Sequence, residues 1–169
     1  MSTSSLPRKP RVIGVKKSLA IVASSYNEPY VNALIEATRN EIREAMPSVS
    51  MPLYRVPGAG EIPVCAEYVI LHADADVVIA LCVIIKGQTD HADLIALSVS
   101  NALQEIACRH LTPIINEVLL VENEMQAKER CFGVQLNRGI EAARAATAMA
   151  ELFQKLDATY TPARARPTA

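Results

Sequence analysis

Four short stretches combine glycines and polar side chains in a way that suits ligand binding or proton transfer. They are residues 24–27 (Ser-Ser-Tyr-Asn), 58–61 (Gly-Ala-Gly-Glu), 86–91 (Lys-Gly-Gln-Thr-Asp-His) and 121–123 (Val-Glu-Asn). Each follows an apolar run that is typical of a strand. Because ligands of open α/β sheets bind beyond the carboxyl ends of the strands, we expect the four stretches to share one site.

The third stretch carries the most specific chemistry. Gly87 lets the backbone approach a ligand, Thr89 or Asp90 can cap the helix that follows, and free N–H groups at a helix start suit an anion such as phosphate. His91 falls in the first helical turn, where the helix dipole opposes protonation and favours a neutral imidazole that accepts a proton. The alternative is a surface histidine at a helix start, and position alone does not separate the two.

The second stretch excludes one function and leaves another open. A dinucleotide-binding motif needs a third glycine where Pro63 stands, so Gly58-Ala59-Gly60 does not predict a nicotinamide site. Glu61 opens the next helix, where capping is the simpler role unless its carboxylate faces the pocket.

Arginines and cysteines add weaker indications. Arg130 and Arg138 lie near helix ends and can each hold a phosphate through two hydrogen bonds, although a single arginine is more often a surface ion-pair partner. The four cysteines have no close pair of the zinc-binding kind, so we expect free thiols and no metal.

Alternating strands and helices must position these residues. Apolar runs predict strands over residues 19–23, 49–56, 77–83 and 113–120. Helical spacing predicts helices over residues 28–45, 61–71, 92–108, 125–131 and 139–156. This order is typical of an α/β fold with a parallel sheet flanked by helices. Small residues fill most of the last helix, so we expect it to be buried on two sides, the second supplied by another subunit.

Composition bounds the function further. The 169 residues, 50% hydrophobic and 21% charged, suit one domain over residues 18–157, between a basic flexible arm (1–17) and a flexible tail (158–169). Between the arms, ten basic and eighteen acidic residues leave a charge of −8, which disfavours nucleic acid as a partner. No apolar run reaches the roughly 18 residues of a membrane span, and we expect a cytoplasmic protein.

The order of the motifs resembles the lumazine synthase family of riboflavin biosynthesis. The matching pieces lie at residues 21–27, 56–63, 83–91 and 129–139, in the family's order and approximate spacing. The resemblance implies a three-layer flavodoxin-like sandwich around a four-stranded parallel sheet. It also implies a homo-oligomer built from pentamers, with active sites between neighbours; a decamer or a 60-subunit shell stays open.

The same resemblance implies the reaction. 5-Amino-6-(ribitylamino)uracil condenses with 3,4-dihydroxy-2-butanone 4-phosphate to 6,7-dimethyl-8-ribityllumazine, with release of phosphate and water and without a cofactor or metal. His91 matches the proton-transfer histidine. The implied substrate-binding residues are Tyr26, Asn27, Ala59, Gly60, Glu61, Val83, Ile84, Ile85, Gln88, Thr89, Asn116, Arg130 and Arg138.

Three positions depart from the family pattern. Gly60 and Asn116 stand where the family commonly has aromatic rings, and Tyr26 replaces phenylalanine or tryptophan. Losing two rings enlarges or reshapes the pyrimidine pocket. Two other functions therefore stay in view: a protein of the same fold that binds a flavin or lumazine without turnover, and a structural shell protein.

Overall fold

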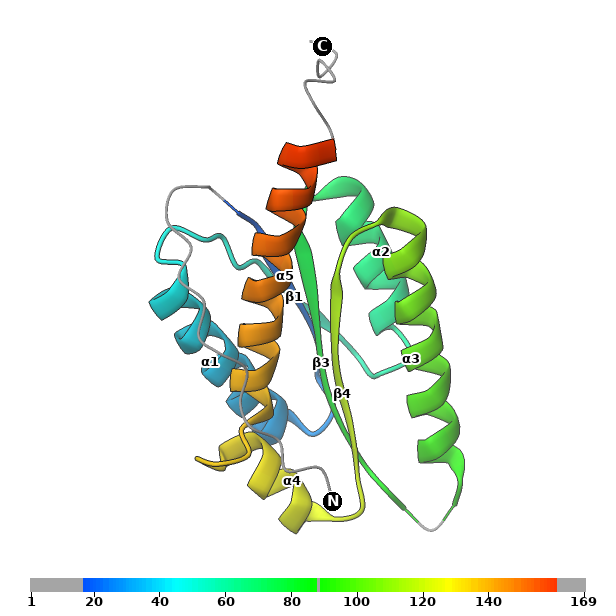
Figure 1. The fold of residues 1–169 in the computed structure, drawn as a ribbon. Helices are drawn as coiled ribbons and strands as arrows, with labels where there is room; N and C mark the ends of the chain where they lie inside the picture. The colour runs from blue at the N-terminus through cyan, green and yellow to red at the C-terminus, as the bar shows by residue number, and fades with distance from the viewer. Residues whose placement is uncertain (1–16, 88, 161–169) are drawn as a thin grey trace.

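The computed structural model describes residues 17–87 and 89–160, and within them a four-stranded parallel sheet is flanked by helices on both faces (Figure 1). The strands are β1 (Leu19–Ser24), β2 (Leu53–Val56), β3 (Val77–Ile85) and β4 (Ile114–Val121). The helices are α1 (Glu28–Ala45), α2 (Ile62–His72), α3 (His91–His110), α4 (Glu124–Phe132) and α5 (Arg138–Tyr160). The nine predicted elements are confirmed.

The layers follow from the apolar pattern of the strands. Every residue of β1 is buried, and β3 is buried from Val77 to Val83, since these central strands are covered on both faces. Helices α1, α4 and α5 enclose one core, and α2 and α3 enclose the other (Figure 1). The strand order β2-β1-β3-β4 is that of a flavodoxin-like sandwich and places a switch point between β1 and β3.

Two boundaries differ from the sequence prediction by more than two residues. Strand β2 begins at Leu53 rather than at residue 49, because Pro52 has no N–H to donate to a ladder. Before it, the chain forms only an isolated bridge at Ser50, and the Pro52 carbonyl accepts from Ile21 of β1. Helix α5 continues to Tyr160, three residues into the predicted tail. The predicted basic arm, apart from Lys17, and the rest of the tail lie outside the described residues.

The small residues of α5 are buried within their own chain. Ala142, Ala143, Ala146 and Ala150 are buried in the core that α5 shares with α1 and the sheet. At Gly139 an added Cβ would lie 2.7 Å from the Leu34 carbonyl oxygen, so α1 and α5 approach to backbone contact. These four alanines face α1 and the sheet of their own chain, whereas Ala148 on the same helix is exposed. That α5 also contacts another subunit stays a prediction.

Candidate functional site

A cavity of about 410 Å³ opens at the carboxyl ends of β1 and β3, at the switch point of the sheet. Eight of the predicted site residues line it: Tyr26, Asn27, Ala59, Val83, Ile84, Ile85, Thr89 and His91. Backbone and apolar side chains form most of the wall, and the neighbouring Gly58, Cys82, Gly87, Ala92 and Ile95 complete it. Gly58 and Gly87 belong to stretches that sequence analysis expected at the site, whereas Cys82, Ala92 and Ile95 were not singled out, although strand and helix periodicity places them beside residues that were.

Asn27 joins the two central strands at the cavity. Its backbone adopts a left-handed conformation (φ 54°), which asparagine tolerates better than most residues. Its side-chain amide donates a 2.7 Å hydrogen bond to the Val83 carbonyl, so the turn after β1 is tied to the end of β3. The preceding Tyr26 keeps 73% of its surface exposed, which leaves its ring available to a ligand at the mouth.

Glu61 stabilises the turn after β2 rather than the helix after it. Its carboxylate accepts a 2.8 Å hydrogen bond from the Gly58 N–H and makes no side-chain cap of α2. The capping prediction was therefore wrong. At Gly60 an added Cβ would meet no atom within 4 Å, so open space lies beside this turn. Gly60 and Glu61 do not line the cavity themselves.

The turn between β3 and α3 is held by charge. The Lys86 ammonium lies 3.1 Å from an Asp93 carboxylate oxygen and 2.9 Å from one of Glu122, and these hydrogen bonds raise the Lys86 pKa. His91 is the first residue of α3 and is exposed at the cavity. Asp90 occupies the capping position, but no side chain caps α3 there, so the predicted Asp90 or Thr89 cap is not formed. Gln88 lies outside the described residues.

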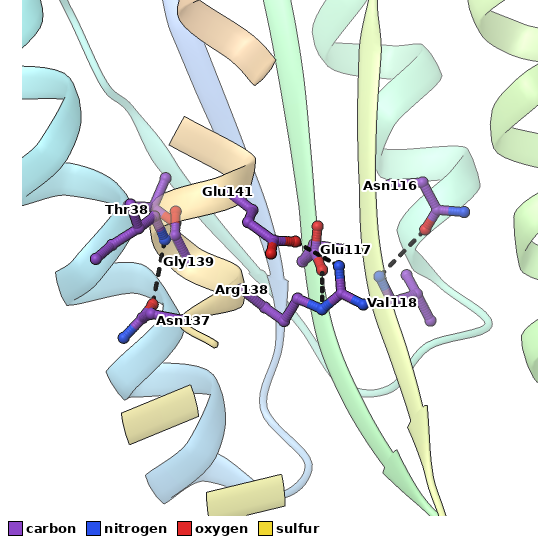
Figure 2. A network of polar contacts seen from close by, with 9 residues as sticks. Thr38, Asn116, Glu117, Val118, Asn137, Arg138, Gly139 and Glu141 are labelled. Carbon is purple, nitrogen blue, oxygen red and sulfur yellow. Dashed lines mark hydrogen bonds and ion pairs between the residues drawn. The ribbon is translucent and has the colours of Figure 1, made fainter. Parts of the chain in front are cut away.

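Three predicted site residues lie on the other side of the fold or away from the cavity. Asn116 on β4 donates to the Ser100 hydroxyl of α3 over 2.9 Å. Arg130 lies in the last turn of α4, where it donates to the Gln126 amide oxygen over 3.3 Å. Arg138 begins α5 and pairs with Glu117 and Glu141 (Figure 2). Within one chain, the cavity and these residues are separate.

A family model described as 6,7-dimethyl-8-ribityllumazine synthase matches residues 16–154. The chain belongs to this family. A 6,7-dimethyl-8-ribityllumazine synthase of a Polaromonas species is 37% identical over 145 residues, which cover 85% of this chain and 91% of that one. The protein of the same name from Aquifex aeolicus is 39% identical over 137 residues, covering 80% and 89%.

Among solved structures, a GDP-L-fucose synthetase from Naegleria fowleri bound to NADP is 7% identical, with a TM-score of 0.40, and covers 95% of this chain and 51% of that one. This likeness is too low to bear on function.

The structure also contains a buried charged residue, Glu117, that sequence analysis missed. Glu117 points from the middle of β4 toward α5, and burial raises its pKa to about 7, with the Arg138 guanidinium opposing and the Glu141 carboxylate adding to the shift. The signal was present as a single acid inside an apolar strand. Among the described residues, no group of three His, Cys, Asp or Glu side chains is arranged to hold a metal, and no helix is long and apolar enough to cross a membrane.

Proposed function

We propose that the protein is a 6,7-dimethyl-8-ribityllumazine synthase that condenses 5-amino-6-(ribitylamino)uracil with 3,4-dihydroxy-2-butanone 4-phosphate. The observation that carries the proposal is the cavity at the β1–β3 switch point, which gathers eight of the predicted site residues in a chain of this family. Such a cavity holds two small molecules against one imidazole, and holding reactants together is a large part of catalysis.

The wall of the cavity suits a flat ring and a sugar chain. Val83, Ile84 and Ile85 form an apolar strand end, and the exposed Tyr26 lines the same cavity, so we place the pyrimidine against these residues. The turn at residues 58–61, fixed by the Glu61 carboxylate, presents backbone groups to the ribityl hydroxyls.

The turn at residues 86–91 suits the phosphate. Backbone N–H groups at the start of α3 carry no side-chain cap and are available to an anion. The family resemblance adds Gln88 and Thr89 to the phosphate-binding residues. His91 stands at the same helix start and moves the protons of imine formation, phosphate elimination and ring closure. General acid–base help of this kind contributes about 10² to 10⁴ in rate. The reaction requires no redox step, and we propose no cofactor.

The site is completed by a second copy of the chain. Asn116, Arg130 and Arg138 lie outside the cavity, so a neighbouring subunit brings them to it. Large exposed apolar side chains on α2 and α3 support subunit contacts: Val64, Tyr68, Leu71, Leu94 and Leu97. We propose a homo-oligomer built from pentamers, which sedimentation or electron microscopy of the purified particle tests. The four cysteines are free, which fits a reducing cytoplasm.

The decisive experiment mixes purified protein with both substrates and follows the absorbance and fluorescence of the lumazine product. We expect product well above the rate of the uncatalysed condensation. Tight binding of a flavin or lumazine without any such rate enhancement would contradict the proposal and favour a binding protein of the same fold. Assembled particles with neither activity nor affinity would favour a structural shell.

A further inference from the structure

The junction of β4 and α5 holds two carboxylates against one guanidinium. Glu117 Oε1 lies 3.8 Å from Arg138 Nε, and the Glu117 side chain is only 11% exposed. Glu141, one turn along α5, forms a close ion pair with Arg138 Nη1. Figure 2 shows both carboxylates pointing at the arginine, one from the strand and one from the helix.

The surroundings of Glu117 are otherwise poor in charge. Its register partner on β3 is the fully buried Leu81, and its strand neighbour Val118 is apolar. From α4, the Cys131 thiol faces the same region, and burial together with the Glu117 charge raises the Cys131 pKa to about 12. A carboxylate in such a place depends on Arg138 for its stability as an ion.

Charge balance gives the cluster two states. With both acids ionised, Glu117, Glu141 and Arg138 sum to −1, and with Glu117 protonated they sum to zero. Since burial raises the Glu117 pKa to about 7, the two states exchange near neutral pH. When Glu117 is ionised, its carboxylate attracts the Nε side of Arg138 toward β4. When Glu117 is protonated, the Arg138 guanidinium stays paired with Glu141 alone.

We propose that Glu117 is a positioning residue, which holds Arg138 toward β4 when ionised and frees it for substrate when protonated. The inference rests on the proposed function, in which Arg138 contacts a substrate across a subunit boundary. Glu117 itself touches no substrate in this scheme. The scheme requires that the Arg138 guanidinium cannot form full ion pairs with the Glu117 carboxylate and with a substrate at the same time.

Kinetics across pH test the proposal. KM for each substrate and kcat are measured from pH 5.5 to 8.5 for the unmodified protein, for Glu117→Gln and for Glu105→Gln, a matched change at an exposed position of α3. In the unmodified protein and in Glu105→Gln, we expect KM of at least one substrate to rise roughly threefold to tenfold as the pH passes 7, the effect of one nearby charge. In Glu117→Gln this rise should be absent, with kcat changed less than about twofold. An equal rise in Glu117→Gln, or a change confined to kcat, overturns the proposal.

A second measurement does not need activity. Melting temperatures of the unmodified protein, Glu117→Gln, Arg138→Ala and the double variant form a mutant cycle. We expect a coupling of about 2 °C or more at pH 8 and none at pH 5.5. Coupling in a protein with no synthase activity would refute the proposed function while leaving the ionic contact intact. Active protein without coupling would refute the positioning role alone.

Discussion

The cavity at the carboxyl ends of β1 and β3 and the junction of β4 with α5 are built in opposite ways. The cavity is shaped by turns that hydrogen bonds hold in place, such as those of Asn27 to Val83 and of Gly58 to Glu61, and Lys86, whose ion pairs hold the turn after β3, does not line it. At the β4–α5 junction, in contrast, charged side chains already pair with one another: Arg138 contacts two carboxylates.

The proposed reaction draws on both regions of the chain. The cavity has the shape and the imidazole, while Arg130 and Arg138 lie outside it. In the proposed assembly a neighbouring subunit presents both arginines to the cavity, so that activity depends on assembly.

The largest expected effect is on the cavity side. His91→Ala should lower kcat by about 10² to 10⁴ because the reaction loses its proton carrier while both substrates still bind. His72→Ala is the matched control, since His72 contacts Tyr68 on α2 and does not line the cavity. Product formation at saturating substrate measures both variants. A His91→Ala enzyme with full kcat would remove the chemistry from this cavity.

The next effect belongs to the β4–α5 junction and concerns stability. The folded-state pKa of Glu117, about 7, lies above its usual value of 4.5, so between these pH values the folded chain keeps a proton that the unfolded chain has lost. The free energy of unfolding should therefore fall with rising pH in this window by about 3 kcal/mol relative to Glu117→Gln, and should stay level above it.

Urea unfolding of both proteins at pH 5 and pH 8 measures this difference. A constant gap between the two proteins at the two pH values would show that Glu117 titrates as an ordinary exposed acid. Burial at the β4–α5 junction would then not raise the Glu117 pKa.

Much of this comparison was predictable from the sequence. Periodicity located all nine elements, and the positions of glycines and polar residues after the strands located the cavity, because both depend on short-range patterns. The sequence was less informative where a side chain can contact more than one partner. Glu61 can cap a helix or hold a turn with the same carboxylate, and spacing does not decide between the two. The alanines of α5 likewise predict a close neighbour without specifying that α1 is one of them. The pairing of Arg138 with Glu117 joins residues on different elements, which no spacing reveals.

A substitution of Arg130 tests whether a residue outside the cavity contributes to substrate binding. Arg130→Ala should raise KM for the phosphorylated substrate about tenfold or more, since a charged hydrogen bond is worth about 1.5–3 kcal/mol. Lys128→Ala, which removes an exposed cation from the same helix, should change KM little. Steady-state kinetics at varied phosphorylated substrate makes the comparison.

Mixed assemblies show whether Arg130 acts from a neighbour. When His91→Ala and Arg130→Ala chains are unfolded together and refolded in equal amounts, about one quarter of the shared sites should carry both intact residues if each site draws on two subunits. Activity near that fraction is expected. If the mixture is no more active than the average of the two variants, the arginine and the histidine belong to the same chain's site.

A smaller effect is expected from the link between the strands. Asn27→Ala removes the hydrogen bond to Val83 and places alanine in a left-handed conformation, which together should cost about 1–3 kcal/mol of unfolding free energy. Asn27→Gly keeps the backbone conformation accessible and loses only the amide. Urea midpoints that are equal for the two variants would mean that the backbone conformation at residue 27 contributes nothing.

The smallest effect is expected at Gly60, beside the cavity, and is compared with that of Gly139 at the start of α5. Gly60→Ala places a Cβ in open space, so its unfolding free energy should rise by about 0.4–1 kcal/mol through the lower entropy of the unfolded chain. Gly139→Ala forces a Cβ to 2.7 Å from the Leu34 carbonyl oxygen, and should instead lose about 1–3 kcal/mol. Urea unfolding measures both. Because the cavity turn has room for a side chain and the α1–α5 contact has none, opposite signs are required, and a destabilised Gly60→Ala would mean that the space beside residues 58–61 is filled in the assembled protein.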